Sequence, residues 1–276
     1  MLDTNFHPRN QPQKQVERAP SEQNYGKILN VKVTITQISH LLAFVRDCIV
    51  RRKKFLIVTP NSEIILQAQN DPELMKILNS ADLALLDSYG VFLALKFLGV
   101  SLPANPIIKG RKAFIELITL ANKKSWKVYL LGGRMGISKD AAKKLSYIFK
   151  KVKLEASDGP MLDKNGQPES QLDMDSQKDV IQKINSFAPQ LLFVGFGAPK
   201  QEKWVAANFK HLNVGGVMVV GGTFDFVSGR AQIPPIWMEG LGLEWLWRGI
   251  REPWRFKRVI NAVVLFPWKV FLSRLK

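Results

Sequence analysis

Residues 190–197, QLLFVGFG, decide the fold class of this chain. A short run dominated by apolar side chains and ending in glycines is typical of a buried β-strand that runs into a tight turn. Residues 200–208, KQEKWVAAN, follow with the composition of a helix. A buried strand, a glycine turn and a helix together make one unit of an α/β fold.

The same alternation extends in both directions from this unit. Further strands are predicted at residues 54–58, 83–86, 127–131 and 214–220, and helices at residues 62–80, 113–123 and 138–150. Residues 157–179 are polar and are predicted to form a loop that leads into another helix. Strands that are apolar throughout, separated by helices, indicate a Rossmann-like α/β fold whose mostly parallel sheet is covered by helices on both faces.

Composition divides the chain into three segments. We expect a disordered extension over residues 1–25, which are polar and lack the apolar region of a signal peptide. Residues 26–229 hold the α/β pattern, and residues 230–276 are predicted to form a basic, Trp-rich helical appendage. With 276 residues, 46% of them apolar, the chain is long enough to bury a substantial core.

The formal net charge of +17 indicates an anionic partner, which could be a nucleic acid, phospholipid headgroups or a phosphorylated small molecule. The appendage has nine Lys and Arg against three Asp and Glu, and it holds five of the seven Trp. Tryptophan beside basic residues favours lipid headgroups and a diphosphate, so we expect no nucleic-acid partner. The rest of the excess charge is spread along the chain.

Two apolar stretches approach the length of a membrane span. Residues 83–100 contain Asp87 and Lys96, and residues 259–275 contain Lys269. A charge at the centre of a bilayer costs on the order of a few kcal/mol. We therefore predict a strand end, a loop and a buried helix for the first stretch. For the second we predict an interfacial helix, on a protein that is made in the cytoplasm.

The composition gives no basis for a metal site. The single Cys, Cys48, excludes a disulfide framework, and the three His are far apart. Asp173 and Asp175 form an Asp-x-Asp pair, a pattern that holds a divalent cation in many sugar-nucleotide enzymes. They lie in a polar stretch rather than after a strand, so we interpret them as a solvated pair.

Ligands of open parallel sheets bind at the carboxyl ends of the strands. The candidate residues at such ends are Thr59, Asn61, Asp87, Gly132, Gly133, Gly195, Gly197 and Asp225. Glycines there let backbone N–H groups approach a phosphate, although a plain tight turn also explains them. Asp87 directly follows an apolar strand, where it could take a proton from a hydroxyl or cap the next turn.

The loop GFGAPKQEKW, residues 195–204, is the most specific of these features. Lys200 could meet a phosphate and Gln201 could bind both a donor and an acceptor edge of a base or sugar, with Glu202 beside them. The glycines of residues 132–136, GGRMG, lack the G-x-G-x-x-G spacing of dinucleotide sites. The pattern shows no acidic residue at the end of a following strand about 20 residues further on. Both observations argue against a nicotinamide-dependent oxidoreductase.

Four arginines of the appendage are spaced by three, four and three residues: Arg248, Arg251, Arg255 and Arg258. On a helix their side chains would share one face, although Pro253 disfavours a helix at the residue before it. Guanidinium groups beside Trp suit diphosphates and lipid headgroups. A solvated basic face is the alternative.

Three motifs follow one another along the second half of the chain. They are GFGAPKQEKW from residue 195, VVGGTFDFVSG from residue 219 and GLEWLWRGIREPWRFKR from residue 242. With them the chain resembles the WecG/TagA/CpsF family of bacterial glycosyltransferases, from about Lys27 to Arg258. PKQE and the GLEW segment are specific signatures of that family, whereas the paired glycines alone are not.

The resemblance implies an inverting glycosyltransferase. Such an enzyme would move a hexose such as N-acetylmannosamine from a UDP-sugar to a sugar on a polyprenyl diphosphate, in teichoic acid or exopolysaccharide assembly. It would associate peripherally with the inner face of the cytoplasmic membrane. The family is thought not to need a metal, so no cofactor is expected, and its members can self-associate, which leaves a homo-oligomer open.

The resemblance also implies roles for individual residues. Asp87 matches the proposed catalytic base, and Thr59 and Asn61 match residues of the substrate pocket. Arg111 matches an acceptor or phosphate contact, and Gln201 and Glu202 match the nucleotide-sugar loop. Asp225 matches the GGxFD strand end, and Arg248 and Arg255 match the arginines of the appendage.

The chain departs from the family pattern at two places. Asp-Ser-Tyr-Gly stands at residues 87–90 where Asp-Gly is usual, and Ile-Pro-Pro stands at residues 233–235 where Arg-Ala-Pro is often found. Both changes bear on sugar or acceptor specificity. The first also leaves a non-catalytic sugar-nucleotide-binding scaffold as an alternative function.

Overall fold

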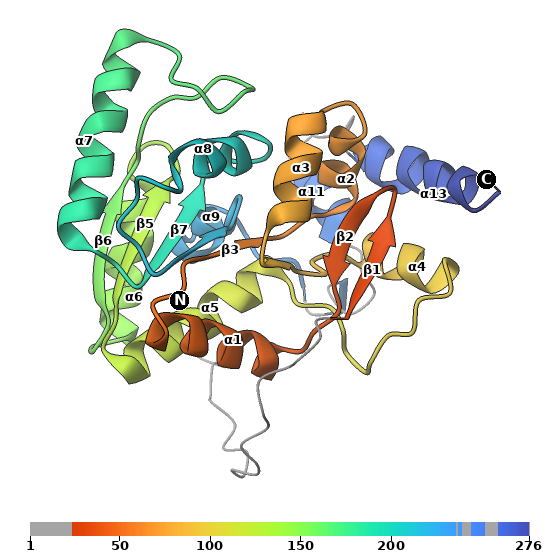
Figure 1. Cartoon of the computed structure of the whole chain (residues 1–276), viewed down its shortest axis with the longest axis horizontal. Coiled ribbons are helices and arrows are strands. Elements are labelled where there is room, and N and C mark those ends of the chain that lie inside the picture. The colour runs from red at the N-terminus through yellow and green to blue at the C-terminus, as the bar shows by residue number, and fades with distance from the viewer. Residues whose placement is uncertain (1–23, 236, 239–243, 252–258, 276) are drawn as a thin grey trace.

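The computed structural model describes residues 24–235, 237–238, 244–251 and 259–275 (Figure 1). Its centre is a six-stranded parallel sheet with the strand order β4-β3-β8-β7-β5-β6. The strands are β3 (Phe55–Val58), β4 (Leu83–Ala84), β5 (Lys127–Gly132), β6 (Lys153–Ser157), β7 (Leu191–Gly195) and β8 (Gly216–Val219). The predicted α/β class and parallel sheet are confirmed.

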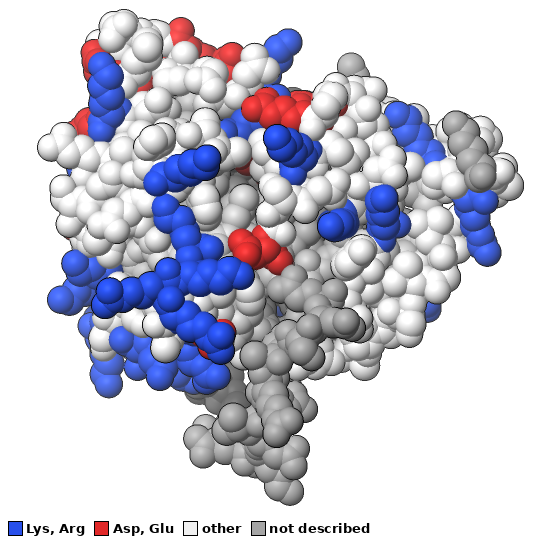
Figure 2. Space-filling view, in the orientation of Figure 1, with Lys and Arg blue, Asp and Glu red and all other residues white. Residues whose placement is uncertain are grey.

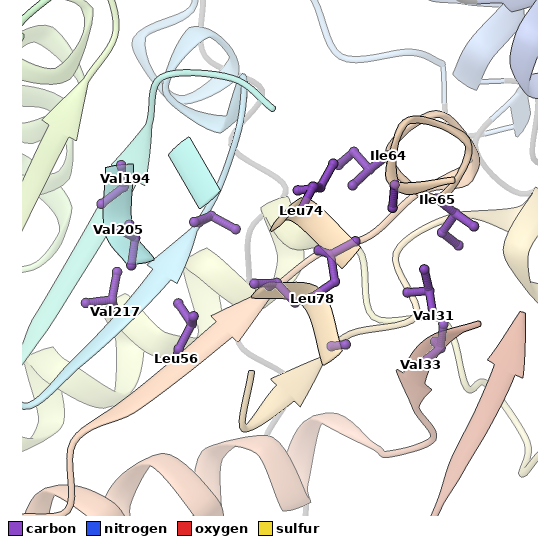
Figure 3. Packing of buried hydrophobic residues seen from close by; sticks show 14 of the residues in the cluster. Val31, Val33, Leu56, Ile64, Ile65, Leu74, Leu78, Val194, Val205 and Val217 are labelled. Atoms are coloured by element: carbon purple, nitrogen blue, oxygen red, sulfur yellow. The ribbon is translucent and has the colours of Figure 1, made fainter. Parts of the chain in front are cut away.

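Helices cover the sheet on both faces. One face carries α2 (Ser62–Ala68), α3 (Pro72–Ser80), α7 (Gln171–Phe187) and α8 (Lys200–Asn208), and the other carries α1 (Ile38–Val50), α5 (Gly110–Lys124) and α6 (Ile137–Ile148). Successive side chains of a strand point to opposite faces, so in β3 Leu56 and Val58 join the first core and Phe55 and Ile57 the second. Figure 3 shows part of the first core, where side chains from α2, α3, α8 and the hairpin strand β2 gather beside those of the sheet.

The helix predicted over residues 62–80 is wrong as one element, because the structure has two helices there. Helix α2 ends at Ala68, and α3 begins at Pro72. Proline lacks an N–H and disfavours the helical conformation in the preceding residue. That residue, Asp71, caps α3 instead by accepting a hydrogen bond of 3.0 Å from the Leu74 backbone.

An antiparallel hairpin precedes the sheet and was not predicted. It consists of β1 (Tyr25–Ile28) and β2 (Val31–Thr34), so Tyr25 lies in a strand rather than in the expected extension, whose residues 1–23 lie outside the described part of the chain. Thr34 forms an isolated parallel β-bridge with Leu85, the residue directly after β4. The strand predicted over residues 83–86 is therefore shorter than expected.

Helix α4 (Tyr89–Phe97) follows β4 and packs on the hairpin. This confirms the helix predicted in place of a membrane span, but only one of its faces is buried, that of Val91, Ala94 and Leu95. Gly26 of β1 permits the contact, because a Cβ there would lie 2.3 Å from a methyl carbon of Leu95. In Figure 1 the hairpin, α4 and the C-terminal helix stand together at the right of the molecule.

The appendage begins without helix at residues 230–235, and most of its remaining described residues are helical. After α9 (Thr223–Ser228), its helices include α11 (Glu244–Arg251), a short π-helix η2 (Asn261–Leu265) and α13 (Phe266–Arg274). Phe266 and Val270 of α13 are buried in the first core, where α13 meets α2 and α4. Among the described residues, no helix is both long and apolar enough to cross a bilayer.

Candidate active site

The carboxyl edge of the parallel sheet brings the predicted strand-end residues together. From one side of the sheet to the other, the strands β4, β3, β8, β7, β5 and β6 end next to Asp87, Thr59, Gly221, Gly195, Gly132 and Asp158. These residues come from segments that are up to about 160 residues apart in sequence, and only the parallel arrangement places them along one edge.

Asp87 and Thr59 lie on either side of Gly110, the first residue of α5. A Cβ on Gly110 would lie 3.4 Å from Asp87 Oδ1 and 3.4 Å from the Thr59 methyl carbon. The Gly110 N–H donates to Asp87 Oδ1 at 2.5 Å. The carboxylate thus sits at the N-terminus of a 15-residue helix, where the helix dipole favours negative charge. Gly110 was not among the predicted site residues, although its place between a loop and a helix start could have signalled it.

Asn61 and Arg111 lie next to this pair in sequence and have local contacts. Asn61 caps α2 by accepting a hydrogen bond of 3.0 Å from the Ile64 N–H. Arg111 follows Gly110 on α5, and its guanidinium carbon lies 5.2 Å from the ring centre of Phe226 on α9. Asp225 precedes that ring, so the packing of α5 against α9 brings the predicted Arg111 and Asp225 into one region.

Glycine residues contact one another at the carboxyl ends of β5 and β7. Gly132 and Gly133 have φ angles of 108° and 75°, which only glycine adopts readily. A Cβ on Gly132 would lie 2.8 Å from the Gly195 carbonyl, and the Gly133 N–H donates to that carbonyl oxygen at 3.2 Å. The chain continues from β5 to α6 over one face and from β7 to α8 over the other, which is the kind of position where open sheets bind ligands.

The expectation that no acidic residue ends a strand after GGRMG is wrong. Strand β6 ends at Ser157, and Asp158 follows it directly. Its carboxylate accepts hydrogen bonds from the Gly136 N–H at 2.9 Å and from the Ser138 hydroxyl at 3.3 Å. Both Asp158 oxygens therefore hold the turn that begins α6. The sequence pattern missed β6 because this edge strand alternates polar with apolar residues.

Gln201 connects the β7 loop to the β8 loop. Its side-chain oxygen accepts hydrogen bonds from Gly197 N–H at 3.2 Å and from Gly221 N–H at 3.0 Å. Its amide nitrogen donates to Glu202 Oε1 at 2.9 Å. Gln201 and Glu202 are buried, at 2% and 1% exposure, so in this structure they hold two glycine loops in place. Their predicted contact with a nucleotide-sugar stays a prediction.

Glu202 is a buried carboxyl group with one oxygen unpaired. Its Oε2 has no hydrogen-bond partner. Burial disfavours the ionised form and raises the pKa of Glu202 to about 7, against the opposing effect of the Gln201 hydrogen bond. Burial therefore lets Glu202 keep its proton at a pH at which an exposed glutamate is ionised.

Lys200 faces the loop between β6 and α7. Its ammonium group donates to the Leu162 carbonyl oxygen and lies 3.7 Å from Glu169. The predicted phosphate contact of Lys200 stays a prediction. Arg248 lies on α11, and Arg255 lies outside the described residues, so their predicted role at the site stays a prediction too.

The Asp-x-Asp pair lies on α7. Asp173 accepts hydrogen bonds from the Met161 N–H and the Ser170 hydroxyl, and Asp175 forms an ion pair with Lys178. These hydrogen bonds lower the pKa of Asp173. The described part of the chain offers no group of three His, Cys, Asp or Glu side chains that could hold a metal ion.

Comparison with known proteins agrees with this arrangement. Residues 26–276 match the family described as "Glycosyl transferase WecG/TagA/CpsF family". The chain is 32% identical over 208 residues to an N-acetylglucosaminyldiphosphoundecaprenol N-acetyl-beta-D-mannosaminyltransferase of Bacillus subtilis (strain 168), covering 75% of each chain. A protein of the same name from Bacillus spizizenii (strain ATCC 23059 / NRRL B-14472 / W23) is 29% identical over 226 residues, covering 81% of this chain and 80% of the relative.

A further relative of that name, from Staphylococcus aureus (strain MRSA252), is 25% identical over 220 residues, which cover 80% of this chain and 81% of the relative. The match to the family model extends over nearly the whole chain, including the sheet, the strand-end motifs and the appendage. The resemblance seen in the three motifs is thereby confirmed, and the chain is a glycosyltransferase that belongs to the WecG/TagA/CpsF family.

Proposed function

We propose that this enzyme transfers an N-acetylmannosamine-like hexosyl group from a UDP-sugar to a sugar carried on a polyprenyl diphosphate, with inversion at the anomeric carbon, in cell-wall polymer assembly. The observation that supports this most is the convergence of Thr59, Asp87 and Gly110 at the carboxyl edge of the sheet. The names of the relatives support the sugar and the lipid-linked acceptor.

The proposed reaction is a single displacement. Asp87 accepts the proton of the acceptor hydroxyl as that oxygen bonds to the anomeric carbon. The bond from that carbon to the diphosphate breaks at the same time, and UDP leaves. The Gly110 N–H fixes Oδ1 of Asp87 and thereby sets the direction of the carboxylate. A side chain held in this way contributes typically about 10²- to 10⁴-fold to the rate as a general base.

The leaving diphosphate needs positive charge or N–H donors. We assign this role to the backbone of the glycine turns after β5, β7 and β8, together with Arg111, Arg248 and Arg255. A metal ion is not part of this proposal, since both carboxylates of the Asp-x-Asp pair are engaged by neighbouring groups around the start of α7. We propose that the enzyme works at the inner face of the cytoplasmic membrane, where a polyprenyl-linked acceptor is present.

The test is UDP release from UDP-N-acetylmannosamine in the presence of a lipid-diphosphate-linked N-acetylglucosamine acceptor. We expect Asp87→Asn to lower kcat by about 10²- to 10⁴-fold while the protein stays folded, because the amide cannot take the proton. Asp173→Asn, a change of the same kind on α7, is the matched control and should keep the wild-type rate. A rate for Asp87→Asn near that of the wild type would refute the assignment of the base.

A chelator tests the metal-independent mechanism. Turnover in excess EDTA should equal turnover without it, because arginines and backbone N–H groups supply the positive charge in this proposal. Loss of turnover in EDTA, restored by a divalent cation, would overturn it while leaving the transferase assignment standing.

A further inference from the structure

Helix α4 is apolar on its outer face as well as on its inner one. Val91, Ala94 and Leu95 are buried, as expected for a helix that packs on a core. The outer face carries Tyr89, Leu93 and Phe97, exposed to 41%, 49% and 40%. Residues four apart form one stripe on a helix. A helix at the surface of a water-soluble domain normally carries polar side chains on that stripe.

Helix α13 repeats this pattern. Phe266 and Val270 are buried, and the opposite face is again apolar. Its exposed large side chains are Trp268, Phe271, Leu272 and Leu275. Trp268 is exposed to 57% and Leu275 to 69%, so a large part of this apolar face is open to water.

The two exposed stripes form one continuous surface. The ring centres of Phe97 and Phe271 are 6.3 Å apart, and Phe271 stacks on Trp268 at 5.9 Å. Arg274 joins the helix ends, since its guanidinium group donates to the Phe97 carbonyl oxygen at 2.7 Å and lies 4.7 Å from that ring. We call this the α4–α13 surface, made of Tyr89, Leu93, Phe97, Trp268, Phe271, Leu272 and Leu275.

The segments that form this surface are free of acidic residues, whereas α2, which packs against α13, carries the partly buried Glu63. Residues 23–46, 88–115 and 253–276, which include the hairpin, α4 and α13, contain no Asp or Glu. Lys96, Lys269 and Arg274 lie on the two helices themselves. In Figure 2 the right-hand part of the molecule, where Figure 1 places these elements, shows Lys and Arg but no Asp or Glu.

We infer that the α4–α13 surface docks onto an anionic lipid bilayer at the depth of the headgroups, with α4 taking part as fully as the appendage. The inference rests on the proposed function for the location of the acceptor. Exposed aromatic and aliphatic side chains on helices whose own charges are all basic match the acyl boundary and the anionic headgroups of such a bilayer. A symmetric contact with a second copy would instead bring two equally basic surfaces together, with Lys96 and Arg274 on both sides and no acidic residue on either helix to pair with them.

Docking through α4 brings the bilayer next to the proposed base. Ser88 caps α4 by accepting a hydrogen bond of 3.4 Å from the Val91 N–H, and Asp87 is the residue before it. An acceptor diphosphate held in the headgroup layer would therefore present its sugar close to the start of the docked helix. The Asp-Ser-Tyr-Gly sequence at residues 87–90 supplies both the cap and the first aromatic side chain of the surface.

A fluorescent probe on α4 tests this with the full chain. In a Cys48→Ser background, which removes the one native cysteine, Leu93→Cys is labelled with the environment-sensitive dye NBD. Vesicles of phosphatidylcholine with phosphatidylglycerol should shift its emission to the blue, and vesicles of phosphatidylcholine alone should do so far less. Leu172→Cys is the matched control. This residue lies on α7, away from the α4–α13 surface (Figure 1), and is exposed to 82%, so its probe should not shift.

A pair of serine variants measures how much α4 contributes. Leu93→Ser/Phe97→Ser should lower binding to the anionic vesicles at least about tenfold, like Phe271→Ser/Leu272→Ser on α13. Ile148→Ser/Leu172→Ser removes two exposed apolar side chains elsewhere and should bind like the wild type. Far-ultraviolet circular dichroism checks that each variant is folded.

Two results would overturn the inference. One is an unshifted probe at position 93 on vesicles that bind the protein, which would leave docking to the appendage alone. The other is unchanged vesicle binding of the α4 variant together with loss of a dimer in sedimentation velocity, which would make the surface a contact between copies. Vesicle binding needs no sugar donor, so failure of the proposed transferase reaction would appear separately, as absence of UDP release by the wild type.

Discussion

At the scale of single residues, Glu202 combines full burial, one unpaired oxygen and a pKa raised to about 7. Because an unfolded glutamate ionises with a pKa near 4.5, the folded state keeps a proton that the unfolded state releases between these two values. The free energy of unfolding therefore falls as the pH rises through that window and is lowest above pH 7. The whole effect is at most about 3 kcal/mol.

Replacement of this carboxyl group by an amide should remove that pH dependence. We expect Glu202→Gln to have a Tm close to that of the wild type at pH 5 and a higher Tm at pH 8, because an amide never carries the buried charge. Differential scanning calorimetry of both proteins from pH 5 to pH 8 measures this. Other titrating groups cancel in the difference, and a Tm difference that is constant with pH would contradict the expectation.

At the scale of elements, a buried lysine joins two helices on one face of the sheet. Lys203 of α8 is exposed to 6%, and its ammonium group lies 2.8 Å from Asp71 and 3.1 Å from Glu73 at the start of α3. Burial, the largest single cause, would lower the pKa of Lys203, but the hydrogen bonds and charges of Asp71 and Glu73 together outweigh it and raise the pKa. The break between α2 and α3 thus serves the packing, because it turns the acidic N-terminus of α3 toward this lysine.

Loss of Lys203 should cost more than loss of a lysine in an exposed pair. Lys203→Ala leaves two carboxylates without their buried partner, and we expect the free energy of unfolding to fall by about 1–3 kcal/mol, the exposure of Glu73 moderating the loss. The matched control is Lys183→Ala, which removes a solvent-exposed ion pair with Asp179 on α7 and should cost less than about 0.5 kcal/mol. Urea denaturation compares the two, and equal losses would show that burial of the Lys203 pair adds nothing.

At the scale of the whole molecule, positive charge lies in two regions for different physical reasons. One is the α4–α13 surface, and the other is the amino edge of the sheet. Figure 2 shows Lys and Arg gathered at the lower left, where Figure 1 places α1, α5 and α6. Helices of a parallel α/β sheet end at the amino edge, where cations interact favourably with the helix dipole. Lys54 donates to the carbonyl oxygens of Phe209 and Leu212 beyond α8, and Lys127 donates to that of Phe187 at the end of α7. Part of the charge that looked diffuse in the sequence, including Lys54 and Lys127, therefore stabilises helix ends.

The C-terminal helix is part of the core as well as of the surface. Phe266 and Val270 are buried against α2 and α4, so removal of residues 259–276 should lower the Tm by several degrees as well as vesicle binding. Thermal unfolding of the truncated and full chains tests this, with Leu275→Ser as a control that changes only an exposed side chain. An unchanged Tm after truncation would mean that α13 contributes nothing to the core.

Residues with a strong local signal could be predicted from the sequence. The central strands of the sheet are apolar throughout because both their faces are buried, so β3, β5, β7 and β8 stand out without a structure. The candidate glycines follow from the ends of these strands, Asp87 follows from the end of the strand predicted at residues 83–86, and the three motifs identify the family. The edge strand β6 and the hairpin were missed, since short or half-exposed strands alternate polar with apolar residues and resemble loops.

The sequence by itself thus determined the fold class, the edge of the sheet that carries the candidate site and the family. Only the tertiary structure decided that Gln201 connects the loops of Gly197 and Gly221, that Asp158 holds the turn before α6, and that α4 and α13 form one surface. The physical reason is the separation along the chain of the residues that interact. Strand and helix patterns depend on neighbours within a few residues, whereas these contacts join segments from about 20 to about 175 residues apart, which only chain crossovers and core packing bring together.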